Sequence, residues 1–222
     1  MGIFDILGPV MVGPSSSHTA GAVRLGLFAR ALLGGPPRKA EMALHGSFAA
    51  TGEGHGTHLA LLAGLLGLEP DDERIPEARN LASDAGLEVQ FTLADLGEVH
   101  PNSVCFTLEG SQGPLTLCGS SVGGGRIQVW ELDDFPVELD GEYPTILMTY
   151  PDRPGWIAVV SALLAQARLN IATIKAHRTA RGGVALLSIQ CDQVPPESTL
   201  VALRSLPDVV SVRFVPALGG HA

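Results

Sequence analysis

The chain has 222 residues, of which 45% are hydrophobic and 17% are charged, a composition typical of a globular protein with one large domain or two small ones. Its formal net charge is −9, and its only lysines are Lys39 and Lys175. Because no basic face is available to neutralise phosphates, these values argue against a nucleic-acid-binding protein and against a partner in an acidic membrane.

Two features of the sequence bear on the cellular compartment. Residues 1–12 are apolar, but they lack a basic leader and are too short to cross a bilayer. We therefore expect neither a signal peptide nor a membrane span, and a cytoplasmic location. The cysteines Cys105, Cys118 and Cys191 lie 13 and 73 residues apart without a C-x-x-C pair. This spacing favours neither a disulfide framework nor a self-contained cluster site, so we expect buried, reduced thiols.

A group of hydroxyls and an imidazole directly precedes the first helical pattern. The apolar residues Val23, Leu27 and Ala31 predict a helix over residues 20–33. One hydroxyl is enough to cap a helix, whereas the unpaired N–H groups and the dipole at this end favour a carboxylate or phosphate. We interpret the group as an anion site; the alternative is an N-cap beside a histidine satisfied by its neighbours. Its members are Ser15, Ser16, Ser17, His18 and Thr19.

Helix and strand signals alternate in the first part of the chain. We expect a strand over residues 39–45, an apolar helix over residues 57–66 after a Gly-rich turn, and a helix that starts with Pro76 and ends before Gly86. Turn residues then separate four strands, which predicts antiparallel pairing in a mixed α+β domain. These strands are expected over residues 87–93, 104–108, 115–119 and 127–132.

Glycines surround two further groups of candidate residues. Glu53, His55 and His58 could supply three ligands to zinc or iron, which would make the chain a stand-alone metal hydrolase. The neighbouring glycines favour instead a loop and a helix start, in which His55 or Thr57 contacts a substrate, and we expect no metal site. Residues 121–125 are compatible with a hairpin turn or with a backbone nest for an anion.

The second part of the chain begins after residues 133–142, an acidic stretch with one proline that we interpret as a linker. The signals that follow predict the order βαββαβ of a ferredoxin-like fold. We therefore expect domains over residues 1–132 and 143–222. The strands are expected at 143–150, 171–179, 184–190 and 209–215, and the helices at 154–169 and 197–206.

Four motifs in one order carry a resemblance to a known family. They are residues 13–19 (GPSSSHT), 46–57 (GSFAATGEGHGT), 100–103 (HPNS) and 121–125 (SVGGG). Together they resemble the beta domain of the iron–sulfur L-serine dehydratases, and the chain from about Tyr143 onward resembles an ACT domain. The resemblance covers nearly the whole chain and implies the separate beta subunit of a two-chain enzyme.

The resemblance implies a lyase that converts L-serine to pyruvate and ammonia. It places a [4Fe–4S] cluster on the cysteines of an alpha subunit, the implied partner. A pyridoxal enzyme is disfavoured because neither lysine has a Gly-rich phosphate loop beside it. The implied catalytic residues are His18, our first choice for the general base, and Ser16, although the base could equally lie on the partner. The implied substrate-binding residues are Ser15, Ser17, Thr19, Ser47, His55, Thr57, His100 and Asn102.

The ACT resemblance implies an effector site at a subunit interface and a homodimer formed through either domain. The residues that would bind the effector, for which serine is the obvious candidate, are Asp152, Pro154, Gly155 and Asn170; the alternative is that they only cap and end a helix. A second functional interpretation also stays open. The first domain resembles the allosteric substrate-binding domain of some phosphoglycerate dehydrogenases, which would make the chain a non-catalytic amino-acid sensor.

Overall fold

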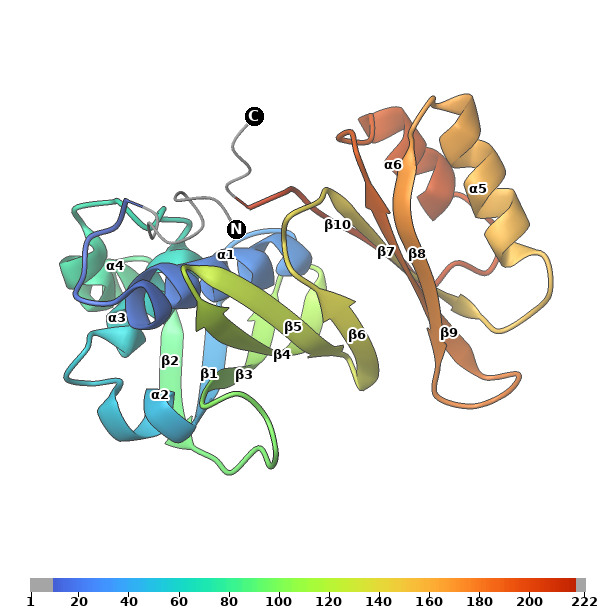
Figure 1. Ribbon diagram of the computed structural model, residues 1–222. Coiled ribbons are helices and arrows are strands. Elements are labelled where there is room, and N and C mark those ends of the chain that lie inside the picture. The colour runs from blue at the N-terminus through green and yellow to red at the C-terminus, as the bar shows by residue number, and fades with distance from the viewer. Residues whose placement is uncertain (1–9, 219–222) are drawn as a thin grey trace. The chain divides into compact units, whose positions relative to one another are not determined.

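The computed structural model describes residues 10–218, so the expectation for residues 1–12 falls almost wholly outside the described residues. The chain divides into two compact units (Figure 1). The first extends to Asp133 and includes Glu138–Asp140, and the second comprises Asp134–Val137 and the chain from Gly141 onward. Within residues 10–218, no helix has both the length and the hydrophobicity that crossing a bilayer requires.

A six-stranded sheet has the order β2-β1-β3-β4-β5-β6, and its strands β1 to β5 lie in the first unit. Strands β3, β4 and β5 pair antiparallel, as predicted. The expectation for β2 was wrong, because β2 runs parallel to β1. The helices between β1 and β2 form a crossover that returns the chain to the same end of the sheet, and such a crossover joins parallel strands. The strands are β1 (Lys39–His45), β2 (Glu88–Leu93), β3 (Asn102–Gly110), β4 (Gly113–Gly123), β5 (Arg126–Leu132) and β6 (Phe135–Leu139).

Helices of the first unit cross at very close range. At the crossing of α1 and α3, a Cβ added to Gly26 would lie 2.5 Å from the carbonyl oxygen of Leu61, and one added to Gly64 would lie 2.8 Å from the Cα of Gly26. Only glycine allows this approach at both positions. The helical elements are the π-helix η2 (Ser16–Gly21), α1 (Ala22–Leu33), α2 (Gly46–Thr51), α3 (Thr57–Leu66), the 3-10 helix η3 (Ile75–Glu77) and α4 (Ala78–Asp84).

The interpretation of residues 133–142 as a linker was wrong for the strand β6. Phe135, Val137 and Leu139 are buried and alternate with exposed residues, the pattern of a strand with one covered face. Asp133 and Asp134, with φ of 46° and 65°, form the tight turn that folds β6 back beside β5. This turn lacks glycine, and the sequence signal for a hairpin was therefore weak.

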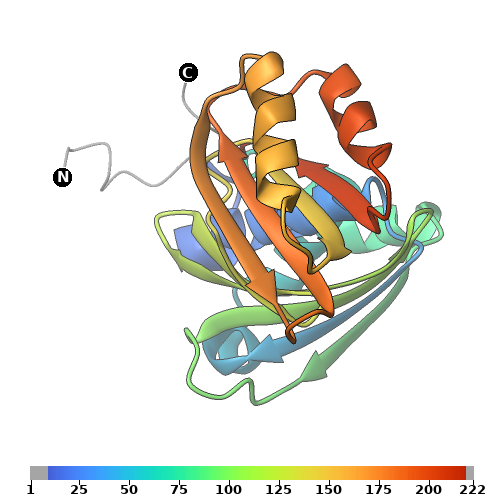
Figure 2. The same cartoon turned by 90° about the vertical axis from the view of Figure 1, so that its right-hand side faces the viewer.

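The second unit has the predicted order βαββαβ, with a sheet in the order β10-β7-β9-β8. Figure 2 shows α5 and α6 side by side on one face of this sheet. The core between these two helices and the sheet contains Ile146, Met148, Val160, Leu164 and Ile189. The elements are β7 (Thr145–Pro151), α5 (Trp156–Gln166), β8 (Ile171–Arg178), β9 (Val184–Cys191), α6 (Glu197–Arg204) and β10 (Ser211–Val215).

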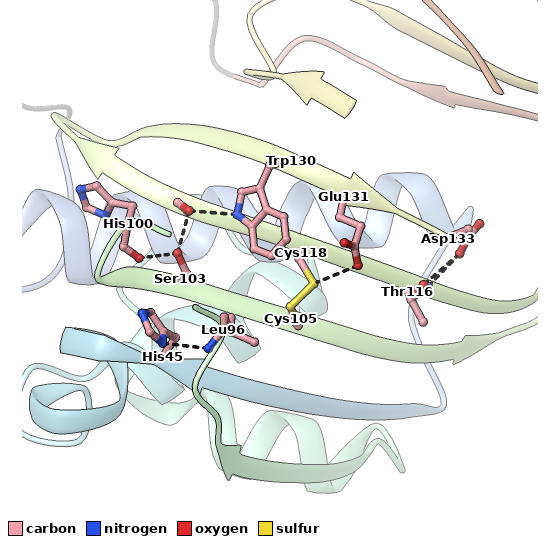
Figure 3. The surroundings of a disulfide bond; sticks show 11 residues. His45, Leu96, His100, Ser103, Cys105, Thr116, Cys118, Trp130, Glu131 and Asp133 are labelled. Atoms are coloured by element: carbon pink, nitrogen blue, oxygen red, sulfur yellow. Dashed lines mark hydrogen bonds between the residues drawn. A yellow bond between two sulfur atoms is a disulfide. The ribbon is translucent and has the colours of Figure 1, made fainter. Parts of the chain in front are cut away.

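The expectation of reduced thiols holds for one cysteine and fails for two. Cys105 on β3 and Cys118 on β4 are register partners with Cα atoms 4.1 Å apart, and they form a disulfide (Figure 3). Their separation of 13 residues is spanned by a β-hairpin, which brings the two positions opposite each other. Cys191 is free and buried, and its burial raises the pKa of the thiol.

The disulfide predicts the number of titratable thiols. Denatured, unreduced protein treated with a thiol-specific chromogenic reagent should show one thiol per chain, that of Cys191, and reduction should raise the count to three. The variant Cys191→Ser should show none before reduction. Three thiols before reduction would contradict the pairing of Cys105 with Cys118.

The close helix crossing predicts a large effect from one methyl group. Gly64→Ala places a Cβ against the backbone of α1 and should lower the free energy of unfolding by about 1–3 kcal/mol. Gly54→Ala is the matched control, because its nearest atom, the Thr51 carbonyl oxygen, is 3.8 Å away, and it should change stability by less than about 0.5 kcal/mol. Urea unfolding measures the free energy of unfolding of both variants. Equal values for Gly64→Ala and Gly54→Ala would contradict the close contact between α1 and α3.

Candidate functional site

The hydroxyl-rich motif forms the first turn of a helix and not a loop before one. Residues Ser16–Gly21 form a π-helix that leads directly into α1. Ser15 is its N-cap, and Ser15 Oγ accepts a hydrogen bond from the His18 N–H at 3.4 Å. The predicted start of the helix at residue 20 was therefore too late. Single π-helical turns occur often at functional sites, since they redirect the side chains that they carry.

The π-turn places the His18 imidazole against two hydroxyls of α2. His18 Nε2 lies 3.2 Å from Ser47 Oγ and 3.3 Å from Thr51 Oγ1. Thr51 Oγ1 also donates to the Ser47 carbonyl oxygen at 2.9 Å. The edge of the imidazole packs on Phe48, with ring centroids 5.4 Å apart. The motifs at residues 13–19 and 46–57 thus meet at the imidazole of His18.

The surroundings of His18 favour its neutral form. Partial burial is the main cause that lowers the pKa of His18, the nearby His55 lowers it further, and a hydrogen bond with the Ser47 backbone raises it. The His18 and His55 ring centroids are 4.9 Å apart. His55 Nδ1 donates to the Thr51 carbonyl oxygen at 2.9 Å, so neutral His55 carries its lone pair on Nε2. A neutral imidazole can accept a proton from a substrate.

The remaining predicted residues of the first unit lie at different depths. Ser15, Ser16 and Ser17 are half-buried, whereas Thr19 is buried against Gly13. Thr57 is fully buried at the start of α3, and its hydroxyl makes no hydrogen bond within the described part of the chain. Of the substrate-binding residues predicted in the later motifs, Ser47 and His55 are therefore the ones whose side chains contact His18 in the described part of the chain.

His100 and Asn102 contact each other and β4, and no contact joins their side chains to His18. His100 Nδ1 accepts from the Asn102 N–H at 3.1 Å, and Asn102 Nδ2 donates to the Ser121 carbonyl oxygen at 3.5 Å. The loop reaches the site through its backbone instead. The Pro101 carbonyl oxygen accepts from the Ser47 N–H at 2.8 Å, at the start of α2.

Thr51 is a site residue that the sequence analysis missed. Its hydroxyl contacts both His18 and Ser47. The signal was the spacing of Ser47 and Thr51, because residues four apart share one face of a helix. No helix was predicted for this segment, although residues Gly46–Thr51 form the helix α2.

The alternative of a metal hydrolase finds no support in the geometry. His55 lies beside His18, whereas the His58 ring packs on Phe91 with centroids 4.5 Å apart. Within residues 10–218, no three histidine, cysteine or acidic side chains are placed to hold a metal ion. The described residues also do not fit an iron–sulfur cluster, because Cys105 and Cys118 are bonded to each other and Cys191 is buried alone.

The glycines after Ser121 form a hairpin turn, the first of the two interpretations. Gly124 and Gly125, with φ of 61° and 75°, are the two residues between β4 and β5, as a type I′ turn requires. Arg24 of α1 donates from Nη1 to the Gly125 carbonyl oxygen at 3.0 Å. The turn is therefore anchored to the same helix that follows His18.

The second unit has a cleft of about 480 Å³ at the start of α5. Asp152, Pro154 and Gly155 line it, as the effector hypothesis requires, together with the rings of Tyr150 and Trp156. Asp152 accepts from the Gly182 N–H at 2.9 Å, which is the main cause that lowers the pKa of its carboxyl group. Asn170 does not line this cleft. It follows the C-terminal end of α5 and donates to Asp192 Oδ2 at 2.6 Å.

Comparison with known proteins gives one consistent result. Residues 2–99 match a family model described as the serine dehydratase beta chain. The chain is 42% identical over 210 residues to the probable L-serine dehydratase, beta chain, of Bacillus subtilis, covering 95% of this chain and 96% of that protein. It is 39% identical over 214 residues to the L-serine dehydratase, beta chain, of Peptoniphilus asaccharolyticus, covering 96% of each.

More distant similarities involve parts of other proteins. The D-3-phosphoglycerate dehydrogenase of Bacillus subtilis is 23% identical over 160 residues, which cover 70% of this chain and 30% of that protein. Among solved structures, the ACT domain from a GTP pyrophosphokinase of Chlorobium tepidum matches 35% of this chain and 90% of its own length, with 18% identity and a TM-score of 0.28.

The contact between the two imidazoles predicts a shift in one titration. His55→Gln removes an ionisable ring whose charge, when it is protonated, lowers the pKa of His18, so the pKa of His18 should rise. Nuclear magnetic resonance titration of the His18 ring protons, assigned with His18→Gln, measures this. His100→Gln should leave the titration unchanged, because His100 makes its contacts with Asn102. An unchanged or lower pKa in His55→Gln would contradict the coupling.

Proposed function

The chain belongs to the family of L-serine dehydratase beta chains, and we propose that it converts L-serine to pyruvate and ammonia together with a separate alpha chain. The observation that carries this proposal is the His18 imidazole, held in its neutral form between two hydroxyls of α2. This arrangement offers a proton acceptor beside groups that can hold an anion. A chain that only senses an amino acid does not need such an acceptor.

The two chains divide the chemistry. Because the described residues do not fit a [4Fe–4S] cluster, the cluster and its cysteine ligands belong to the alpha chain. The residues of the beta chain then act on the carboxylate and on the α-proton of the substrate. The beta chain alone is expected to be inactive.

The hydroxyls of the π-turn bind the substrate carboxylate. Ser15, Ser16 and Ser17 are half-buried around the helix start, where a negative charge interacts favourably with the dipole of η2 and α1. With the carboxylate held there, the α-carbon of L-serine lies within reach of the neighbouring imidazole.

His18 is the general base in this proposal. It accepts the α-proton, and the electron pair of the broken C–H bond forms the double bond as the β-hydroxyl leaves. The hydroxyl takes up a proton and leaves as water, and the product of this elimination is the enamine 2-aminoacrylate. Protonation of its β-carbon gives an imine, and addition of one water to the imine releases ammonia and pyruvate, so the water lost is regained and the net products are pyruvate and ammonia. His55, with a lone pair on Nε2, lies beside His18 and can pass the proton to solvent.

The alternative of an allosteric sensor has weaker support. Its relative shares 23% identity over a partial match, whereas the beta chains share 39–42% over nearly the full length. Regulation belongs instead to the second unit. The cleft lined by Asp152, Pro154 and Gly155 is proposed to bind a small amino acid, whose ammonium group would pair with the Asp152 carboxylate.

The test is the activity of the two-chain complex, co-expressed and assayed for serine-dependent pyruvate without oxygen. His18→Asn should lower kcat about 10²- to 10⁴-fold, the usual contribution of a general base. Ser16→Ala should mainly raise KM, because it removes a contact to the carboxylate. Ser111→Ala, an exposed serine between β3 and β4, is the matched control and should have no effect.

Complex formation and iron content must match the wild type in every variant. Wild-type activity in both His18→Asn and Ser16→Ala would refute the assigned roles. Binding of L-serine to the beta chain without any dependence of activity on His18 would favour the allosteric sensor.

A further inference from the structure

A chain of hydrogen bonds connects β5 to the loop before α2. Trp130 Nε1 donates to Ser120 Oγ at 3.1 Å, Ser120 Oγ lies 2.7 Å from Ser103 Oγ, and Ser103 Oγ donates to the His100 carbonyl oxygen at 2.5 Å. Figure 3 shows Trp130, Ser103 and His100 in this arrangement. None of these hydrogen bonds is used by the proposed chemistry.

In this series, the donor and the acceptor of every hydrogen bond are determined. An indole N–H can only donate and a carbonyl oxygen can only accept. The Ser103 hydroxyl therefore donates its proton to the His100 carbonyl oxygen, and the Ser120 hydroxyl must donate to Ser103 Oγ. Each hydroxyl accepts one bond and donates one, which strengthens the series as a whole.

The placement of these groups is specific. Ser103 and Ser120 are opposite each other on β3 and β4 and are 0% and 1% exposed, where unpaired hydroxyls would be costly. Trp130 lies at a β-bulge, where the pairing of β4 and β5 skips from Val129 to Glu131. Such a bulge redirects a side chain, and here it aims the indole N–H at Ser120.

The loop that this series of hydrogen bonds stabilises in turn contacts α2. The Pro101 carbonyl oxygen accepts from the N–H groups of Ser47 and Phe48 at 2.8 and 3.4 Å. Gly46, with φ of 56°, packs its Cα so closely that an added Cβ would lie 2.6 Å from that oxygen. A helix of only six residues, Gly46–Thr51, is marginal without such contacts.

We propose that Trp130, Ser120 and Ser103 are positioning residues for His18, acting through the loop at residues 100–102 and through α2. The inference rests on the proposed function, because it assigns these residues to the alignment of the general base. They do not touch the substrate. They fix where α2 begins, and α2 carries the two hydroxyls, of Ser47 and Thr51, that hold His18 Nε2.

The first experiment measures the structure directly, by hydrogen exchange of residues 46–52 in the two-chain complex. Ser120→Ala and the milder Trp130→Phe, which removes only the N–H donor, should speed exchange in this segment. Thr116→Val, on the same strand but bonded to Asp133, is the matched control. Unchanged exchange in both Ser120→Ala and Trp130→Phe would overturn the proposal, since Trp130→Phe is not expected to unfold the domain.

The second experiment is a double-mutant cycle on kcat. Ser120→Ala should lower kcat about tenfold, the equivalent of one lost hydrogen bond, with KM changed by less than about twofold. In the His18→Asn background the same change should have little further effect, and Ser120→Thr should restore most of the rate. Equal effects in both backgrounds would overturn the positioning role. An unaffected rate in His18→Asn alone would instead refute the proposed function, and the exchange experiment would still decide this inference.

Discussion

The site depends on the close approach of backbone segments at glycines. An added Cβ on Gly21 would collide with the Ser121 hydroxyl, and one on Gly46 would collide with the backbone of Pro101. The first contact fixes the π-turn against β4, and the second fixes α2 against the loop before β3. Gly21 ends the π-turn that carries His18, and Gly46 begins the helix that carries its two hydroxyl partners, so the two contacts hold both sides of the site.

The chemistry of the site follows from its partial burial. Burial removes the advantage that water gives to an imidazolium, and a second imidazole beside it adds repulsion. The groups that face His18 Nε2 are neutral hydroxyls. A carboxylate in their place would stabilise the protonated ring and would oppose the lowering of the pKa of His18.

The sequence predicted the regular elements well and the local departures poorly. The strand at Lys39–His45 and the helix at Thr57–Leu66 have the predicted bounds, because each has a clear apolar period and a clear end signal. The π-turn, α2 and the disulfide depend instead on partners far along the chain, such as Ser121, Pro101 and the β3–β4 hairpin. The family motifs contain Ser47, Thr51 and His55, whose side chains contact His18, but they did not distinguish residues that face His18 from those that do not.

The disulfide also has a consequence for how the sheet forms. Cys105 faces Cys118, and two positions away on the same strands Ser103 faces Ser120. If β3 slipped by one residue along β4, the two sulfurs would point to opposite sides of the sheet, and so would the two serines. A hairpin shifted in this way therefore cannot form the disulfide. In every molecule that has the disulfide, β3 and β4 pair in the register that places Ser103 opposite Ser120.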